Sequence, residues 1–198
     1  MIAAEIALAQ DVATRGQWTA YAAMAATDAV LFAPRLVWAG PWLKGRANPP
    51  APLRRQPHEA WSSCDGSLVV SRGAWQQDRG GTGRFTTIWQ RQPNGNYKWA
   101  LDFVGVVQPV PPAPEMLSAH IADCPERRPR REAMGGPDKV RSVKRKDLPP
   151  LDPARHAGAA GDGSLTWEAA TAPDGSRRLS VTWKTDGAEV PLLAEQVP

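Results

Sequence analysis

Three side chains have the types needed for acid–base chemistry: Asp102, Tyr21 and His58. Asp102 lies between Leu101 and Phe103 in an apolar stretch, where a carboxylate is unfavourable unless a partner compensates its charge. Burial in such a place raises the pKa of a carboxyl group and suits it to act as a general acid or base. The pattern therefore predicts Asp102 as a general base, assisted by the Tyr21 hydroxyl or the His58 imidazole.

A structural role for the same residues is the alternative. Asp102 would then pair with an arginine such as Arg72 or Arg91, or accept hydrogen bonds from Trp N–H groups, because ion-pair networks also place acids within sheets. His58 follows Pro57 at the start of a predicted strand, where a surface histidine is more common than a catalyst. The sequence leaves this choice open.

Tryptophan is unusually frequent, with nine Trp against three Phe and two Tyr. Trp buries a large area and keeps one N–H donor, so it serves both hydrophobic cores and ligand pockets. The set either fills the core or lines a pocket for a small, flat apolar or aromatic ligand. The candidate lining residues are Trp18, Trp38, Trp42, Trp61 and Trp89.

The sequence carries no motif for a metal or an organic cofactor. No group of His, Asp or Glu has metal-ligand spacing, and the sequence has no P-loop, dinucleotide fingerprint or G-x-S-x-G motif. Cys64 and Cys124 lie outside any C-x-x-C motif. They are either free thiols or one disulfide, which would stabilise the protein by roughly 2–4 kcal/mol and imply an oxidising compartment.

Two helices are predicted at the N-terminus, over residues 2–14 and 18–26, from apolar residues at helical spacing. Residues 29–38 have the pattern of two short extended pieces, and residues 41–44 that of a single helical turn. A proline-rich loop follows over residues 46–56.

The pattern then changes to strands separated by Asp-Gly and Asn-Gly turns, which favour hairpins. Four strands in an antiparallel meander are predicted, over residues 58–63, 67–76, 83–92 and 97–107. Strict alternation along the last of them places Trp99, Leu101 and Phe103 on one face and Asp102 on the other.

Residues 108–163 have the composition of a proline-rich linker with a possible short helix over residues 115–122. Within it, residues 126–146 hold nine Lys or Arg against three Asp or Glu. A solvated, self-repelling linker is the favoured interpretation, and nucleic acid is an unlikely partner. Residues 164–198 return to a strand pattern and predict a C-terminal β-meander that docks on the main domain or on a partner subunit.

The segments VLFAP, PWLKG, SSCDGSLVVSRGAW and GRFTTIWQRQPNGNYKWALDF resemble the SnoaL-like/DUF4440 branch of the NTF2-like superfamily over about residues 1–107. The resemblance implies an α+β fold, the NTF2-like cone, in which N-terminal helices pack on a strongly curved antiparallel sheet around a pocket. It also implies homodimerisation through the sheet. The superfamily includes ketosteroid isomerase-like and polyketide cyclase-like enzymes, dehydratases and non-catalytic binding modules, and its catalytic pattern does not align with this chain residue by residue.

Three functions are compatible with these observations. The first is binding of a small apolar or aromatic ligand without catalysis, the second an isomerase, cyclase or dehydratase with Asp102 as base, and the third an interaction or dimerisation scaffold. No apolar run approaches the ~18 residues of a membrane-spanning helix, so membrane insertion is not expected. Relatives of this kind are often exported, which implies a periplasmic or secreted protein with a Cys64–Cys124 disulfide and a removed leader; a cytoplasmic protein is the alternative.

Overall fold

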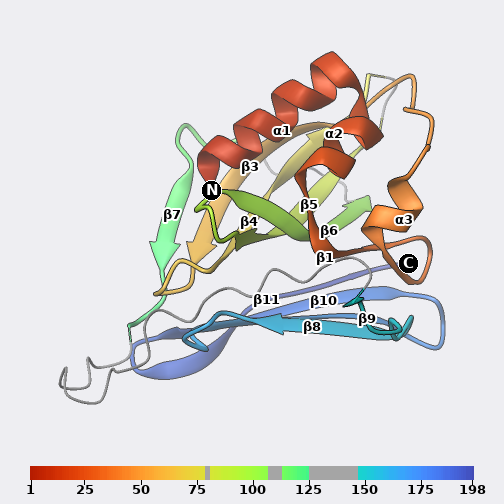
Figure 1. Cartoon of the computed structure of the whole chain (residues 1–198). Coiled ribbons are helices and arrows are strands. Elements are labelled where there is room, and N and C mark those ends of the chain that lie inside the picture. Colours follow the sequence, from red (N-terminus) through yellow and green to blue (C-terminus); the bar gives the residue numbers. More distant parts are fainter. Residues whose placement is uncertain (79–80, 107–112, 125–146) are drawn as a thin grey trace.

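The protein has the three-layer arrangement seen in Figure 1, taken from a computed structural model. The structure describes residues 1–78, 81–106, 113–124 and 147–198. Helices cover one face of a seven-stranded sheet, and a four-stranded sheet covers the other face. The α+β class predicted from the sequence is thus confirmed.

The seven-stranded sheet has the order β2-β1-β6-β5-β4-β3-β7. Its strands are β1 (Ala25–Phe32), β2 (Leu36–Trp38), β3 (Arg54–Ser62), β4 (Leu68–Gln76), β5 (Thr82–Arg91), β6 (Tyr97–Val106) and β7 (Ser118–Ile121). The predicted antiparallel meander is present as β3 to β6. The sheet as a whole is mixed, however, because β1 runs parallel to β6 and β7 runs parallel to β3. The expectation of a purely antiparallel sheet was wrong on this point.

Three helices lie on the side of the sheet that holds the candidate site: α1 (Ile2–Arg15), α2 (Gln17–Met24) and α3 (Ala39–Leu43). Leu8 and Val12 of α1 pack into the apolar cluster beneath the helices. Gly16 has a φ of +88°, a value that glycine adopts readily, and this lets the chain turn directly from α1 into α2. The second helix ends at Met24, two residues before its predicted end, because β1 begins there to pair with β6.

The C-terminal sheet is an antiparallel meander of four strands rather than the three predicted. They are β8 (Arg155–Ala159), β9 (Leu165–Thr171), β10 (Arg177–Thr185) and β11 (Ala188–Val197), and β8 lies in the range predicted as linker. Leu165, Leu179 and Val181 are buried in one apolar cluster with Val70 and Phe103 of the larger sheet. The meander therefore docks on the sheet of its own chain.

The helix predicted over residues 115–122 is absent, because residues 118–121 form β7 instead. Ser118 to Ile121 pair in parallel with Glu59 to Ser62 of β3. A four-residue strand gains its hydrogen bonds only from this tertiary partner, which local sequence periodicity does not reveal. The basic run predicted as part of the linker, residues 126–146, lies outside the described residues.

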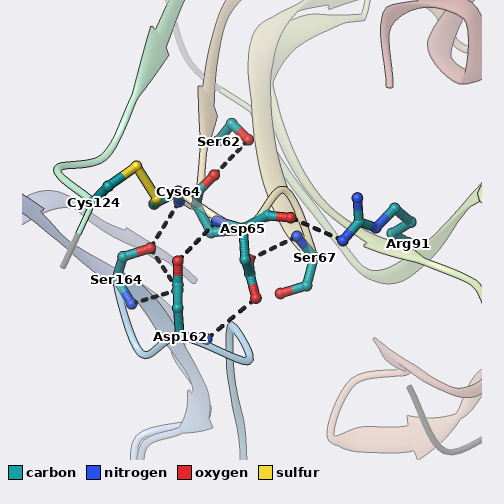
Figure 2. The surroundings of a disulfide bond; sticks show 9 residues. Ser62, Cys64, Asp65, Ser67, Arg91, Cys124, Asp162 and Ser164 are labelled. Carbon is teal, nitrogen blue, oxygen red and sulfur yellow. Dashed lines mark hydrogen bonds between the residues drawn. A yellow bond between two sulfur atoms is a disulfide. The ribbon is translucent and has the colours of Figure 1, made fainter. Parts of the chain in front are cut away.

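Cys64 and Cys124 are joined by a disulfide, with their Cα atoms 5.0 Å apart (Figure 2). The bridge ties the β3–β4 turn to the chain that follows β7. The same turn contacts the β8–β9 turn, since the backbone N–H of Cys64 donates to Ser164 Oγ over 2.9 Å. One corner of the molecule thus holds both sheets and β7 together.

Two copies of the tetrapeptide Asp-Gly-Ser-Leu, at residues 65–68 and 162–165, form this corner. The backbone N–H of Asp65 donates to Asp162 Oδ2 over 2.8 Å, and the N–H of Asp162 donates to Asp65 Oδ2 over 3.2 Å (Figure 2). Burial alone would raise the pKa of Asp65, but hydrogen bonds from Ser67 and Ser63 hold it below its ordinary value. The repeated turns dock on each other through matching hydrogen bonds.

His156 on β8 makes the packing between the sheets sensitive to pH. Its ring meets Trp38 of β2 edge-on at 5.4 Å and Trp167 of β9 at 5.6 Å. Burial lowers the pKa of His156, with the charge of Asp28 opposing the shift. Unfolding therefore allows protonation, so we expect the free energy of unfolding to fall as the pH drops below about 6.5.

This expectation is tested by denaturant unfolding of the wild type and of His156→Gln between about pH 7.5 and about pH 5. The variant should lose part of the slope of stability against pH. His58 keeps some slope in both proteins, because burial lowers its pKa as well. Equal slopes in the two proteins would contradict a titrating role for His156.

Candidate functional site

A cavity of about 160 Å³ lies between the helices and the seven-stranded sheet. Its walls come from α2, α3, β1 and β6, the chain before β3, and one residue of β10. The lining residues are Gln17, Trp18, Tyr21, Leu31, Phe32, Trp42, Leu53, Trp99, Asp102, Val104 and Arg177. Three of the described tryptophans and the principal predicted carboxylate thus meet at one place.

The aromatic rings around the cavity are held at steep angles to one another. Trp18 and Trp42 are perpendicular, with ring centroids 5.3 Å apart, and Trp18 meets Tyr21 at 78° and 5.9 Å. The Trp99 indole N–H donates to the Tyr21 carbonyl over 2.9 Å, and the Arg46 guanidinium stacks 3.5 Å from the Trp42 ring centroid. Edge-to-face packing of this kind fixes ring orientation, so the cavity is shaped before any ligand enters.

Asn48, in the loop before β3, positions the first turn of α2. Its Oδ1 accepts hydrogen bonds from the backbone N–H groups of Trp18 and Thr19, at 2.7 and 3.2 Å. Its Nδ2 donates to the carbonyl of Arg15, at the end of α1. The Asn48 side chain thus provides hydrogen-bond partners for backbone groups at the end of α1 and the start of α2, and so fixes the position of Trp18.

Asp102 pairs with Arg55, which the sequence analysis did not identify. Arg55 Nη1 donates to Asp102 Oδ1 over 2.9 Å and to the Tyr21 hydroxyl over 2.7 Å, while Thr87 Oγ1 donates to the same carboxylate oxygen over 2.7 Å. The Arg55 guanidinium also stacks 3.7 Å from the ring centroid of Phe85. The Arg55 and Asp102 side chains are only 5% and 8% exposed, so this is a buried, hydrogen-bonded ion pair.

Glu5 of α1 continues the network behind the cavity. Its Oε1 accepts hydrogen bonds from Ser71 Oγ and from the Trp89 indole N–H, the latter over 2.9 Å, and lies 3.9 Å from Arg55 Nη2. Two carboxylates therefore share one buried guanidinium. Burial alone would lower the pKa of Arg55, but the charges of Asp102 and Glu5 and the hydrogen bond to Tyr21 outweigh it and raise the pKa above its ordinary value.

The Tyr21 hydroxyl is neutral at the edge of this network. Burial raises the pKa of Tyr21 well above its ordinary value, and the nearby Arg55 charge only partly offsets the shift. Because Arg55 donates to the hydroxyl oxygen, the phenolic proton is free to point elsewhere. Tyr21 can thus act as a hydrogen-bond donor toward the cavity.

The predicted partners of Asp102 are engaged elsewhere. Arg72 pairs with Glu195 of β11, its Nε lying 2.9 Å from Oε1, and Arg91 donates to the carbonyl of Asp65. His58, predicted to assist Asp102, borders two other cavities and does not line the one that holds Asp102. Asp102 and Tyr21 therefore line one cavity, and His58 does not.

Three of the five tryptophans predicted to line a pocket lie elsewhere. Trp38 and Trp61 belong to the cluster between the two sheets, where Trp61 stacks on His120 at 6.1 Å. Trp89 is fully buried in the cluster under the helices and donates to Glu5 and Ser71. Trp18 and Trp42 border the cavity, and so does Trp99, which was not among the predicted lining residues.

Two irregularities in the strands explain what the sequence analysis missed. In the β5–β6 pair, Ile88 pairs with Leu101, but the next residue, Trp89, pairs with Trp99. Ala100 is therefore an extra residue on β6, a β-bulge. Trp99 and Asp102 consequently line the same cavity, against the prediction of opposite faces. In the β3–β4 pair the register shifts just after Pro57, where a missing N–H is tolerated, so β3 extends back to include Arg55.

The described residues contain no group of three or more His, Cys, Asp or Glu side chains placed to hold a metal ion. Within the same ranges, none of the helices combines the length and the apolarity needed to cross a membrane. Comparison of the sequence with protein-family models gave no match, and comparison with curated proteins gave no significant match.

Proposed function

We propose that the protein binds a small, flat apolar or aromatic ligand in the cavity between α2, α3 and β6, as an NTF2-like binding protein. The observation that carries the proposal is the set of fixed aromatic rings around about 160 Å³ of space. Apolar cavities of about 150 Å³ admit a benzene-sized molecule. Antiparallel β3 to β6 with helices on one face supports the NTF2-like resemblance.

The state of Asp102 favours binding over catalysis. A general base needs an oxygen that can take a proton from the substrate, and one of the two oxygens of Asp102, Oδ1, is occupied by hydrogen bonds from Arg55 and Thr87. The Arg55 and Asp102 side chains form a buried ion pair and are only 5% and 8% exposed. In this proposal Asp102 and Arg55 hold the sheet side of the cavity in place.

An isomerase, cyclase or dehydratase that uses Asp102 is the second candidate. It is favoured by one observation, that Asp102 and Tyr21 border the same cavity and share Arg55. A carboxylate beside a hydroxyl donor can remove a proton and stabilise the resulting oxyanion. Turnover of an enone or hydroxy-ketone substrate that disappears in Asp102→Asn and persists in Asp11→Asn would favour this candidate over simple binding.

The predictions of a homodimer, an interaction scaffold and a periplasmic or secreted location stay predictions. The four-stranded sheet covers the sheet face through which the resemblance implies dimerisation. A dimer formed in that manner would therefore need another surface of the molecule.

The proposal is tested by calorimetric titration of the protein with indole, a flat aromatic molecule that suits the aromatic walls of the cavity. We expect one site per chain with a Kd of about 10 µM to 1 mM, the range for so small a ligand. Val104→Trp places a large side chain in the cavity and should weaken indole binding by about tenfold or more. Val106→Trp is the matched control, because Val106 lies two residues along β6 and is 72% exposed.

Two outcomes would contradict the proposal. One is the absence of saturable binding by indole, toluene and similar small aromatic molecules. The other is equal binding by the wild type and the folded Val104→Trp variant, which would place the site outside this cavity.

A further inference from the structure

Three polar side chains that line the cavity are more than nine-tenths buried: Gln17 and Tyr21 are 5% and 4% exposed, and the Asp102 side chain is 8% exposed. Each of them has one hydrogen-bonding atom that no other described residue uses. Buried polar groups in folded proteins almost always have a partner, because an unpaired group has lost its water without compensation. The unused atoms therefore indicate which groups a bound molecule would supply.

Gln17 and Tyr21 offer hydrogen-bond donors from α2. They are four residues apart and so lie on the same face of the helix. Gln17 Oε1 accepts a hydrogen bond from the backbone N–H of Leu53 over 3.0 Å, and Gln17 Nε2 donates to no described residue. The Tyr21 hydroxyl oxygen accepts from Arg55, while its proton has no acceptor within the same part of the chain. The helix side of the cavity thus presents two donors.

Asp102 offers an acceptor from the sheet side. The hydrogen bonds from Arg55 and Thr87 both end on Oδ1, so Oδ2 has no partner among the described residues. Arg55 Nη1 joins Asp102 Oδ1 to the Tyr21 hydroxyl, at 2.9 and 2.7 Å, and so holds the carboxylate and the hydroxyl close together. A ligand that satisfies both must carry its own donor and acceptor close together as well.

We propose that the natural ligand is a single-ring aromatic amide or lactam, with its N–H on Asp102 Oδ2 and its C=O on Tyr21 and Gln17. An amide carries its N–H and its C=O on the same carbon atom, which is the close spacing that the cavity wall requires. An ionised carboxylate only accepts hydrogen bonds, so Asp102 favours an N–H group over a second acceptor. This inference rests on the proposed function and adds the polar group of the ligand to it.

The first test compares benzamide with acetophenone, which has nearly the same shape and keeps the carbonyl but has a methyl group in place of the NH₂. Calorimetric titration of the wild type should give a Kd for benzamide at least about tenfold lower, because only benzamide can donate to the buried Asp102 carboxylate. Acetophenone is the more apolar compound, so a cavity with apolar walls alone would prefer it. The two accounts therefore predict opposite preferences.

The second test concerns the donors on α2. Gln17→Met removes the amide donor and keeps most of the length of the side chain. It should weaken the binding of acetophenone relative to that of toluene by about three- to tenfold, because toluene has no acceptor to lose. Gln10→Met is the matched control, because Gln10 is exposed on α1 and does not line the cavity, and it should leave the ratio of the two Kd values unchanged.

Three results would count against this account. If the wild type binds benzamide no better than acetophenone, the inference fails, while binding of indole still supports the proposed function. If benzamide, acetophenone, toluene and indole all fail to bind, the proposed function fails as well. A ratio for acetophenone and toluene that is the same in Gln17→Met and Gln10→Met would refute the contact of the carbonyl with Gln17. The wild-type comparison alone decides the matter if Gln17→Met does not fold.

Discussion

Replacement of Arg55 by methionine is expected to lower the free energy of unfolding by about 3–5 kcal/mol. The substitution keeps much of the side chain's length but leaves Asp102 and Glu5 buried without the guanidinium that serves both. Removal of one partner of a buried ion pair is costly because the remaining charge has lost its water and its counterion. The Tyr21 hydroxyl and Thr87 would lose a hydrogen-bonding partner as well.

Arg54→Met is the control for this experiment. Arg54 precedes Arg55, is 65% exposed and pairs with Asp78 at the surface, so its loss should cost only about 0–1 kcal/mol. Combining Arg55→Met with Asp102→Asn should recover part of the lost stability, because the double variant removes one of the two uncompensated charges. Urea unfolding of the four proteins measures these differences. A cost for Arg55→Met no larger than that for Arg54→Met would refute a buried ion pair.

Removal of the Cys64–Cys124 disulfide is expected to have the next largest effect. The cysteines are 60 residues apart, and the chain-entropy model gives a stabilisation of about 4 kcal/mol for a loop of that length. The bridge also holds the corner at which the two Asp-Gly-Ser-Leu turns dock. We therefore expect the double variant Cys64→Ser/Cys124→Ser to exchange backbone amide hydrogens faster at residues 65 and 162 than the wild type.

Reductant provides the internal control. Dithiothreitol should lower the Tm of the wild type to near that of the double serine variant, and should leave the Tm of the variant unchanged. If reductant leaves the wild-type Tm unchanged while thiol labelling shows both cysteines reduced, the bridge contributes nothing to stability. Two reactive thiols in protein purified under oxidising conditions would show that the bridge does not form.

Regular patterns in the sequence predicted most of the secondary structure. The helical spacing of apolar residues places α1 close to its observed range, the Asp65-Gly66 turn places the start of β4, and the Asn94-Gly95 turn places the β5–β6 hairpin. These features depend on neighbours in sequence, so they can be inferred locally. The strand β7 and the parallel pairing of β1 with β6 depend on residues far away in sequence and could not.

The sequence singled out Asp102, the carboxylate of the candidate site, but did not indicate Arg55, the cation that pairs with it. Asp102 stood out because a charge within an apolar strand requires a partner, and that reasoning holds. Arg55 was missed because Pro57 marked the beginning of the predicted strand, whereas a bulge accommodates this proline inside β3. Strict alternation likewise predicted Trp99 and Asp102 on opposite faces of the strand. The bulge at Ala100 brings both side chains to the same cavity.

The two sheets dock through a short repeat in the sequence. Asp-Gly-Ser-Leu occurs at residues 65–68, where a turn was predicted, and again at residues 162–165, across the boundary between the predicted linker and the predicted meander. Their reciprocal hydrogen bonds need two turns of the same shape to face each other. Identical turn sequences in two strand blocks are a signal for such docking.

The central claim, that a small aromatic molecule binds between Trp18, Trp42 and Trp99, is tested most directly by anomalous diffraction. Crystals of the protein soaked in 4-bromophenol would be measured at the bromine absorption edge. The account predicts a bromine peak inside the cavity bordered by these rings and Asp102. An empty cavity in crystals that bind bromophenol at other positions would contradict it.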